Sequence, residues 1–436
     1  MSLPRYPRYK DSGLEWLGQV PEHWSVRRLG FYFTERREKV SDREFPPLSV
    51  TRSGIVPQLE TAAKTDDGDN RKKVCRGDFV INSRSDRKGS SGISKFDGSV
   101  SLISTVIQPQ EALDPMFVHH LLRSQPFQEE YYRFGKGIVA DLWSTSYSEM
   151  RNIVLAVPPT SEQQAIAYFI EGETMKIDAL IAEQQRLIEL LKEKRQAVIS
   201  HAVTRGLDPD APMKASGVEW LGHVPAHWEV RRLKHLTPQI TVGIVVEPSQ
   251  YYVDKGVPAL RSLNVRPGAI RQESMVYISP EANETLAKSR LRAGDLVAVR
   301  SGQPGTTAVI PDNLDGCNCI DLIIIRKPHG GSEWFLSWFL GSDAALHQFD
   351  TGSGGAIQQH FNIGTAMDLL VPTPPVGEQH AIAEYLRDRS ERFDALTAEA
   401  ERAIALLQER RTALISAAVT GKIDVRGLAQ TEAEAA

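Results

Sequence analysis

The chain has 436 residues, of which 41% are hydrophobic and 24% are charged, and its formal net charge is −4. This length predicts two or three domains, and the composition is typical of a globular protein. No window contains the roughly 20 apolar residues of a membrane-spanning helix, the start lacks the apolar segment of a secretory signal, and three cysteines imply no disulfide framework. We therefore expect a protein of the reducing cytoplasm with no membrane span.

Basic residues are concentrated in two places, although the chain as a whole is acidic. Between Arg71 and Lys95 there are eight basic residues and two acidic ones, and between Lys255 and Arg300 there are eight basic residues and four acidic ones. A negative total argues mildly against a nucleic-acid partner, whereas a local basic surface favours one. We therefore expect basic surface at matching places in two halves of the chain.

The first predicted element is a motif, SGLEWLGQVPEHWSVRRL at residues 12–29, which returns as SGVEWLGHVPAHWEVRRL at residues 216–233. Aligned from Lys10 and Lys214, the two copies share 15 of 20 residues at an offset of 204. The repeat unit of about 210 residues is far longer than the roughly 20 to 50 residues of solenoid and propeller repeats. So long a period indicates that a pair of domains has been duplicated.

Residues 1–157 carry the first motif and then predict a mixed α/β domain. Short β-type runs such as GDFVIN and SLISTVIQP alternate with glycine, proline, asparagine and serine. The stretch NSRSDRKGSSG overlaps the end of GDFVIN and predicts a loop, and loops on rigid strands often carry binding residues. Its side chains are of the types that bind phosphates or base edges. The candidate DNA-binding residues of this half are Arg52, Lys72, Lys73, Asn82, Arg84, Arg87 and Lys88.

Residues 158–205 predict a long helix. It starts after a Pro-Pro pair, where Ser161 and Gln164 have the form of a capping box, and it ends before Gly206. Gly172 marks a place for a kink or break, because glycine costs about 1 kcal/mol in a helix relative to alanine. Apolar residues at helical spacing form one stripe, which comprises Ile166, Ile170, Ile177, Leu180, Leu187, Leu191 and Val198.

Residues 206–373 carry the second motif and predict a second mixed α/β domain. Its sequence matches the first domain at few points, among them Gly294-Asp295. The run VRSGQPGTT follows the strand-like GDLVAV at the place that matches the first loop. A repeated frame with divergent inserts indicates two different ligands. The candidate DNA-binding residues of this half are Arg261, Asn264, Arg266, Arg300, Gln303, Thr306 and Gln358.

Residues 374–425 predict a second long helix, which aligns with the first without a gap at an offset of 216, and residues 426–436 a flexible tail. About 43 residues of helix are roughly 65 Å long. So narrow an apolar stripe needs a partner helix along its whole length, and we predict that the two helices pack together. Pseudo-symmetry then places the first motif near the end of the second helix, at Gly421 to Gly427. The second stripe comprises Ile382, Leu386, Phe393, Leu396, Ala400, Ala403, Leu407 and Leu414.

Catalytic signatures are missing from the chain. It contains no GxxxxGK[ST], HExxH or GxGxxG sequence. Cys317 and Cys319 lack the second cysteine pair that would complete a zinc site. We therefore expect neither catalytic nor metal-binding residues.

Taken together, the motifs resemble one family, the specificity subunits of type I restriction-modification systems. The resemblance rests on the doubled SG(L/V)EWLG motif, on the PP..EQ.AIA helix starts at Pro158 and Pro374, and on the LL.E(K/R)R segments near Leu190 and Leu406. It covers nearly the whole chain. It implies an α+β fold in which two mixed α/β target-recognition domains are separated by two long helices. These helices would pack as an antiparallel coiled coil within an internal pseudo-twofold repeat.

The resemblance also implies a function. Each domain would read one half of a bipartite, asymmetric site in double-stranded DNA. The helices would set the spacing between half-sites and dock two modification (methyltransferase) subunits. These subunits and the restriction (translocase and nuclease) subunits would use S-adenosylmethionine, ATP and Mg²⁺, so the chain itself would need no cofactor and would not be an enzyme.

Two other functions stay open. A scaffold whose domains bind proteins suits the acidic total but not the two basic clusters. Steeply salt-dependent DNA binding would argue against it, because phosphate contacts release counterions. A nuclease or methyltransferase acting alone would need motifs that the chain lacks, and incubation with DNA, Mg²⁺ and S-adenosylmethionine tests that alternative.

Overall fold

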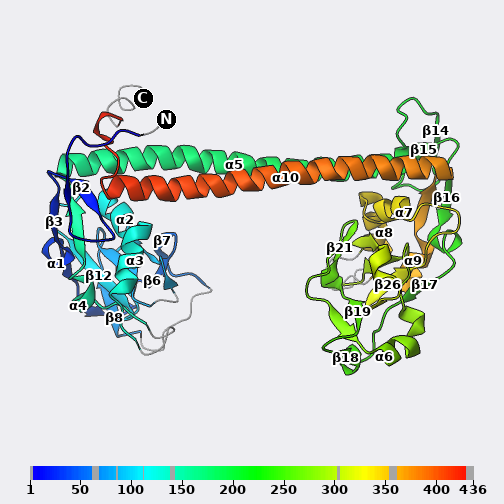
Figure 1. Cartoon of the computed structure of the whole chain (residues 1–436), viewed down its shortest axis with the longest axis horizontal. Helices are drawn as coiled ribbons and strands as arrows, with labels where there is room; N and C mark the ends of the chain where they lie inside the picture. The colour runs from blue at the N-terminus through cyan, green and yellow to red at the C-terminus, as the bar shows by residue number, and fades with distance from the viewer. Residues whose placement is uncertain are drawn as a thin grey trace. The chain divides into compact units, whose positions relative to one another are not determined.

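A computed structural model describes residues 3–60, 68–84, 87–110, 112–137, 143–301, 305–352 and 361–428. The chain divides into two compact units. The first comprises Met1–Gln185 with Glu401–Ala436, and the second comprises Arg186–Ala400. Each unit therefore combines one α/β domain with one half of each long helix (Figure 1).

The long helices are α5 (Thr160–Arg205) and α10 (Val376–Val419), which pack together as predicted (Figure 1). Helix α5 starts one residue before the expected capping serine and continues through Gly172 without a break. The first turns of both helices are buried in the domain cores. Ile166 of α5 belongs to the core of the first unit, and Ile382 of α10 belongs to that of the second. Burial at these ends holds each half-helix to its own domain.

Two ion pairs show that the helices run antiparallel. Arg195 of α5 binds Asp394 of α10 at 2.6 Å in the second unit, and Arg411 of α10 binds Asp178 of α5 at 3.3 Å in the first. Residue 178 of α5 pairs with residue 411 of α10, and residue 195 pairs with residue 394, so the two helices run in opposite directions. The two pairs are copies of each other, because Asp394 and Arg411 stand 216 residues after Asp178 and Arg195, which is the offset of the helix repeat.

The seam between the helices includes many of the expected stripe residues, among them Ile177, Leu191, Phe393 and Leu407, but three leucines depart from it. Leu180, Leu187 and Leu396 were expected to be covered, but they are 46%, 43% and 48% exposed. The less exposed positions follow the 3.5-residue period of a coiled coil, with alternating steps of three and four and one step of seven across the exposed Arg411. On α5 they are Ile177, Ile181, Gln184, Ile188, Leu191 and Arg195, and on α10 they are Ser390, Phe393, Thr397, Ala400, Ile404, Leu407 and Leu414.

The first domain is built on an antiparallel sheet with the strand order β10-β9-β12-β4. Helices α2 (Pro115–Arg123) and α3 (Gln125–Arg133) share one core with this sheet through Phe117, Phe127 and Tyr131. The strands are β4 (Phe33–Glu35), β9 (Phe79–Asn82), β10 (Ser91–Ile93) and β12 (Ser104–Pro109).

The second domain has an antiparallel sheet with the strand order β17-β26-β23-β24. Helices α7 (Glu333–Leu340) and α8 (Asp343–Gly352) follow it, as α2 and α3 follow the first sheet. Read in reverse, the order matches the first sheet strand for strand, so the two domains share a frame although their sequences barely match. The strands are β17 (Ile240–Val242), β23 (Leu296–Val299), β24 (Thr307–Val309) and β26 (Leu322–Ile325).

In each domain, the strand that ends the motif pairs with the strand that leads into a long helix: β3 with β13 and β16 with β27. The remaining elements of the first domain are β1 (Tyr9–Asp11), β2 (Gln19–Pro21), β3 (Ser25–Arg28), α1 (Leu29–Tyr32), β5 (Lys39–Val40), β6 (Leu48–Thr51), β7 (Gly54–Pro57), β8 (Arg71–Val74), β11 (Gly98–Val100), α4 (Tyr147–Met150) and β13 (Val154–Val157). Those of the second domain are β14 (Met213–Ala215), β15 (His223–Pro225), β16 (Glu229–Arg232), β18 (Tyr252–Val253), β19 (Val257–Leu260), β20 (Val265–Arg266), β21 (Ala269–Ile270), β22 (Val276–Ile278), α6 (Pro280–Thr285), β25 (Asn318–Cys319), α9 (Ile363–Asp368) and β27 (Leu370–Thr373).

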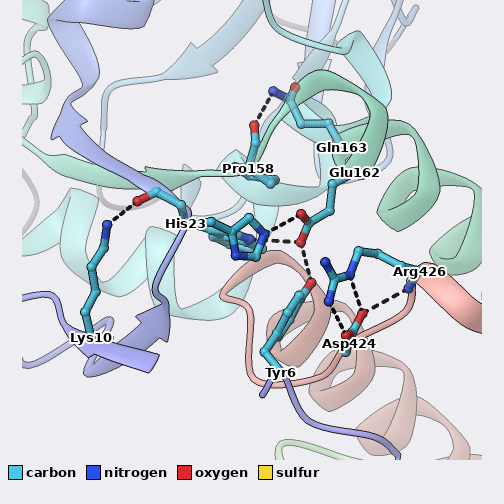
Figure 2. Close-up of polar contacts among 9 residues, drawn as sticks. Tyr6, Lys10, His23, Pro158, Glu162, Gln163, Asp424 and Arg426 are labelled. Carbon is cyan, nitrogen blue, oxygen red and sulfur yellow. Dashed lines mark hydrogen bonds and ion pairs between the residues drawn. The ribbon is translucent and has the colours of Figure 1, made fainter. Parts of the chain in front are cut away.

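The first copy of the motif packs where α5 begins and α10 ends. Trp24 is fully buried, and its indole Nε1 donates a hydrogen bond to Glu162 Oε1 at 2.9 Å. The Tyr6 hydroxyl donates to the same oxygen at 2.6 Å, and His23 Nε2 lies 2.7 Å from the other carboxylate oxygen (Figure 2). The segment after α10 closes the junction, because Asp424 N donates to Pro4 O at 2.8 Å. The predicted position of the motif near Gly421 is confirmed.

The second copy repeats this junction with a different carboxylate. Trp228 is fully buried and donates to Glu378 at 3.1 Å, and His227 lies 2.8 Å from the same side chain. Glu378 stands 216 residues after its equivalent in α5. Its side chain is 28% exposed, against 5% for Glu162. The two junctions therefore share their geometry but differ in burial.

A glycine follows each long helix at the place where the motif approaches it. Gly206 and Gly421 have φ angles of +79° and +72°, which side chains with a Cβ adopt only at a cost. A Cβ on Gly421 would lie 2.4 Å from Pro21 Cδ, and one on Gly206 would lie 3.3 Å from Trp228 Cζ2. At both positions glycine is favoured, because it adopts the left-handed conformation readily and leaves room for the motif residue beside it.

A helix that crosses a membrane needs a long apolar stretch, and the helices of the described segments differ from this pattern. None has an apolar stretch long enough to cross a bilayer.

Candidate nucleic-acid interface

The loop after strand β9 carries the first group of candidate residues. Asn82 is buried, and its Oδ1 accepts a hydrogen bond from Arg84 N at 3.1 Å, which anchors the start of the loop. Arg87 N donates to Arg84 O at 3.2 Å and so turns the chain back toward β10. The side chains of Arg84, Arg87 and Lys88 are exposed. The described part of this loop thus exposes three basic side chains.

Arg52 lies in the turn between β6 and β7 and meets this loop. Its Nε donates to Lys88 O at 3.2 Å, and Arg123, at the end of α2, donates to Arg52 O. Lys88 Nζ stands 5.4 Å from the centroid of the Tyr132 ring. Arg123 and Tyr132 were not among the sequence candidates, because only the tertiary packing of α2 and α3 brings them to the loop. We call the group Arg52, Arg84, Arg87, Lys88 and Arg123 the first basic patch.

Lys72 and Lys73 lie on strand β8 and have partners within the chain. Lys72 Nζ donates to Ser104 O at 2.8 Å and lies 3.8 Å from Glu35, and burial lowers the pKa of this lysine. Lys73 binds Glu38 at 2.9 Å. The structure does not bring these lysines into the first basic patch, and a DNA contact would have to compete with their present partners.

In the second domain, Arg300 directly follows strand β23. Its Nη1 donates to Asp321, the residue before β26, and its side chain is 26% exposed. Thr306 borders the same loop, since its carbonyl oxygen accepts from Val299 N at 2.9 Å. The β20–β21 turn joins them, because Gly268 N donates to Thr307 O at 3.0 Å.

The segment before this turn contains three further candidates with different roles. Asn264 is fully buried, and its amide donates to the carbonyl oxygens of Arg271 and Glu273 at 3.1 Å each, so it shapes the turn. Arg261 donates to Ser274 O at 2.8 Å. Arg266, on β20, is half-buried next to the β23–β24 loop, and its Nη1 donates to Val265 O at 3.1 Å.

Two candidates, Gln303 and Gln358, lie outside the described residues. Their role in DNA binding stays a prediction.

Equivalent places in the two domains carry different chemistry. Asn82 pairs with Ser104 at the end of the first sheet, and Val299 pairs with Leu322 at the end of the second. The next residues along these strands are therefore equivalent: Ser83 with Arg300, and Ile103 with Asp321. In the first domain the Ser83 amide donates to the Ile103 carbonyl at 3.1 Å, whereas in the second an arginine meets a carboxylate. The frame is repeated and the side chains at its tip are not.

Metal-ligating side chains do not gather in the part of the chain that the structure describes. There, no group of three or more histidine, cysteine, aspartate or glutamate residues is arranged to hold a metal ion. Cys317 and Cys319 are buried, and burial raises the pKa of the Cys317 thiol to about 12. Both cysteines belong to a hydrophobic core.

Comparisons with known proteins support one family. No protein-family model matches the chain. The type I restriction enzyme MjaVIII specificity subunit of Methanocaldococcus jannaschii is 22% identical over 426 residues, which cover 94% of this chain and 95% of that protein. The type I restriction enzyme EcoKI specificity subunit of Escherichia coli is 22% identical over 376 residues, 82% of this chain and 77% of that protein.

Solved structures share the fold. A chain from a structure of the type I R-M system, described in terms of complex assembly and conformational transition, has a TM-score of 0.68 at 18% identity and covers 92% of this chain and 98% of its own. The HsdS subunit from Thermoanaerobacter tengcongensis has a TM-score of 0.53 at 18% identity and covers 93% of this chain and 98% of its own. The predicted fold is confirmed, as is the resemblance to type I specificity subunits.

Proposed function

Because its curated relatives are specificity subunits of type I restriction enzymes, we propose that this chain is the non-catalytic, DNA-reading subunit of such an enzyme. Each domain reads one half of a bipartite, asymmetric site in double-stranded DNA. The observation that carries this proposal is the contrast at the sheet tips, where Ser83 and Ile103 stand in one domain and Arg300 and Asp321 in the other. One frame with two different tips suits two different half-sites.

The basic patch supports a DNA partner rather than a protein scaffold. The side chains of Arg52, Arg84, Arg87 and Lys88 are exposed, while the chain as a whole carries a net charge of −4. Arginine and lysine bind phosphates and guanine edges, and arginine is the common choice for specific base contacts. The net negative charge of the rest of the protein repels DNA, whereas the basic patch attracts it. DNA binding by the first domain should therefore be confined to the patch.

The long helices support the docking of two identical partners. Leu180 of α5 and Leu406 of α10 are 46% and 59% exposed in the first unit, and Leu396 and Leu190 are 48% and 51% exposed in the second. The offset of 216 relates Leu180 to Leu396 and Leu190 to Leu406, so each unit carries the same pair of leucines. In each unit the pair flanks one side of the seam, at g and c positions of the heptads.

Exposed apolar side chains that gather in a patch mark protein-binding surfaces, and the same leucine pair stands beside the seam in each unit. Two equivalent leucine pairs fit two copies of one protein, which we propose are the modification subunits. Restriction subunits complete the assembly in the cytoplasm. S-adenosylmethionine, ATP and Mg²⁺ belong to these partners, and the helices set the spacing of the half-sites.

The recognition proposal is tested with the chain, its modification subunits and S-adenosylmethionine on a genomic DNA library. Sequencing of methylated adenines should return one bipartite site with two unlike halves and a constant spacer. The chain without partners should show steeply salt-dependent DNA binding and no methylation. Methylation without any sequence preference, or methylation by the chain alone, would contradict the proposal.

The docking proposal is tested by replacing one leucine pair at a time. Leu180→Ser with Leu406→Ser should reduce the complex from two modification subunits to one, and Leu190→Ser with Leu396→Ser should do the same, as measured by light scattering. Leu59→Ser is the control, since Leu59 is 48% exposed and belongs to the segment after β7 rather than to a helix. Two bound subunits in both double variants would contradict this docking surface.

A further inference from the structure

Asp321 is held in a backbone conformation that few side chains adopt. Its φ is +51°, a left-handed value that aspartate and asparagine tolerate better than most residues. Asp321 N donates to Ile244 O at 3.0 Å, and Ile244 N donates to Cys319 O at 2.8 Å. A Cβ on Gly243 would lie 2.5 Å from the same Cys319 oxygen, so this neighbouring segment packs closely. The corner that carries Asp321 is therefore locked by its surroundings.

Arg300 follows β23, the strand that pairs with β26 after Asp321, and both its side chain and its backbone are hydrogen-bonded. Its Nη1 donates to Asp321 Oδ1, and its carbonyl oxygen accepts from Phe361 N at 3.1 Å. The preceding Val299 donates its N–H to Thr306 O, and its carbonyl oxygen accepts from Gly305 N. Three quarters of the Arg300 side chain is buried. Among the described residues the guanidinium donates once, through Nη1, and its Nε is buried, so a ligand would meet the fork formed by Nη1 and Nη2.

We infer that Arg300 reads a guanine in the half-site bound by the second domain, and that Asp321 is the positioning residue that aims its guanidinium. This inference rests on the proposed function. Arginine bound bidentately to guanine O6 and N7 is the commonest specific contact to the major groove. A guanidinium that is already oriented loses less conformational entropy when it forms that fork.

The carboxylate decides between a base and a phosphate as the ligand. A phosphate contact needs only positive charge, and Asp321, 52% exposed beside the arginine, would repel the phosphate. The edge of a guanine is uncharged overall and presents two acceptors, so the carboxylate orients the arginine without opposing its ligand. A purely stabilising surface ion pair would contribute little to stability and would not by itself compensate for a left-handed aspartate.

The neighbouring surface agrees with a base contact. Val245 and Val246, which continue the segment that holds Asp321, are 49% and 71% exposed. Apolar side chains contact the thymine methyl group in the major groove, whereas phosphate sites are lined by polar and basic groups. The equivalent place in the first domain has Ser83 and Ile103, so the inference concerns the second half-site alone.

The test uses the complex with its modification subunits and the bipartite site found by methylation. Competition binding is measured with duplexes in which each base pair of the second half-site is changed in turn, and with 7-deazaguanine, which lacks N7. One guanine should matter roughly 10- to 100-fold in the unaltered protein. Arg300→Lys, which keeps the charge and loses the fork, should abolish that preference. Asp321→Asn, which tolerates the left-handed backbone, should weaken it at least about threefold.

The control is Asp368→Asn, which removes a carboxylate that binds Arg232 and Lys234 elsewhere in the same domain. It should leave the preference unchanged, and all variants should keep the preference for the first half-site. Unaltered discrimination in Arg300→Lys and Asp321→Asn would overturn the inference, as would an equal loss for every duplex, which marks a phosphate contact. If the unaltered complex shows no sequence preference at all, the proposed function itself is wrong.

Discussion

Glu162 receives hydrogen bonds from the N-terminal segment and from the first motif, and it does so in the first turn of α5. Tyr6, His23 and Trp24 all approach its carboxylate, which is 5% exposed, and burial followed by the hydrogen bond to this carboxylate raises the pKa of Tyr6 (Figure 2). A buried acceptor with several donors is costly to alter, because the buried side chains of Tyr6 and Trp24 would lose their partner in a place that water does not reach. The equivalent Glu378 has two of these partners and is more exposed.

We therefore expect Glu162→Gln to lower the free energy of unfolding by about 1 to 3 kcal/mol, because an amide offers one acceptor oxygen where the carboxylate offers two. Glu378→Gln, the matched change in the second unit, should cost less. Urea midpoints followed by tryptophan fluorescence compare the two variants. Equal losses would show that burial of the carboxylate does not set the effect.

Two neighbouring histidines on α2 should make stability depend on pH. Burial, followed by the charge of Arg123, lowers the pKa of His119 to about 3 and that of His120 to about 4. In the unfolded chain histidine takes up a proton near pH 6.5, so between about pH 6.5 and 4 the unfolded state binds more protons than the folded one. The free energy of unfolding should fall as the pH falls through this window, by up to about 1.4 kcal/mol per pH unit and histidine.

His119→Gln, which keeps an acceptor for the Arg123 Nη1 donor 2.7 Å away, should flatten this dependence. Urea midpoints at pH 7 and pH 5 measure it. His235→Gln serves as the control, because that side chain is exposed on the second domain. The same slope in His119→Gln and in the unaltered protein would count against the assignment to His119.

At the residue scale, the sequence predicted which types of side chain lie in the loops better than it predicted which residues they contact. Arg52 and Lys88 were selected because of their type and loop position, and the structure brings them together. Asn264 was selected for the same reason, but it is buried and bonded to the backbone of its own turn. Arg123 and Asp321 were missed, because neither lies in a motif and both reach their partners only through strand and helix packing.

At the scale of elements, two copied ion pairs link the long helices. The Arg195–Asp394 pair is shorter than the Arg411–Asp178 pair, and the Arg195 side chain is 28% exposed, against 45% for Arg411. Half-exposed pairs contribute little to stability, but opposite charges at fixed positions discourage the helices from sliding by one heptad.

Asp178→Arg should therefore destabilise the first unit by up to about 1 kcal/mol through repulsion of Arg411, and adding Arg411→Asp should restore most of that loss. The matched cycle, Asp394→Arg with Arg195→Asp, should show the larger coupling because its pair is shorter and less exposed. Thermal unfolding of the single and double variants gives both coupling energies. Coupling energies of zero in both cycles would mean that these charges do not hold the register.

For the long helices, the sequence predicted existence, length, pairing and much of the contact face, since Ile177, Leu191, Phe393 and Leu407 of the predicted stripes lie on the seam. The 3.6-residue template selected Leu180, Leu187 and Leu396, whereas the seam follows the 3.5-residue period through Ile181 and Ile188. The difference has a physical reason: supercoiling of two helices keeps a heptad seam in contact, and this depends on the presence of the second helix. Two of the leucines left outside, Leu180 and Leu396, are among those that we propose for docking.

At the scale of the whole molecule, the proposed spacing function predicts a geometric response. One extra heptad in α5 between residues 185 and 186, with one in α10 between residues 400 and 401, preserves the seam and lengthens each helix by roughly 10 Å. The preferred spacer between half-sites should then grow by about three base pairs, at roughly 3.4 Å per base pair. Sequencing of methylated sites measures the spacer, and an unaltered spacer with unaltered half-sites would refute the role of the helices as a ruler.

The sequence by itself determined the duplication, the two long helices, the junctions at Gly206 and Gly421, and the resemblance to type I specificity subunits. These are local or periodic properties: a repeat, a helical period and a cap can each be recognised in a contiguous stretch of residues. Only the tertiary structure decided which side chains meet at the sheet tips. Ser83 and Ile103, like Arg300 and Asp321, lie about twenty residues apart on different strands, and strand register brings them together. Their contact depends on backbone pairing over the whole sheet, which no short sequence pattern encodes.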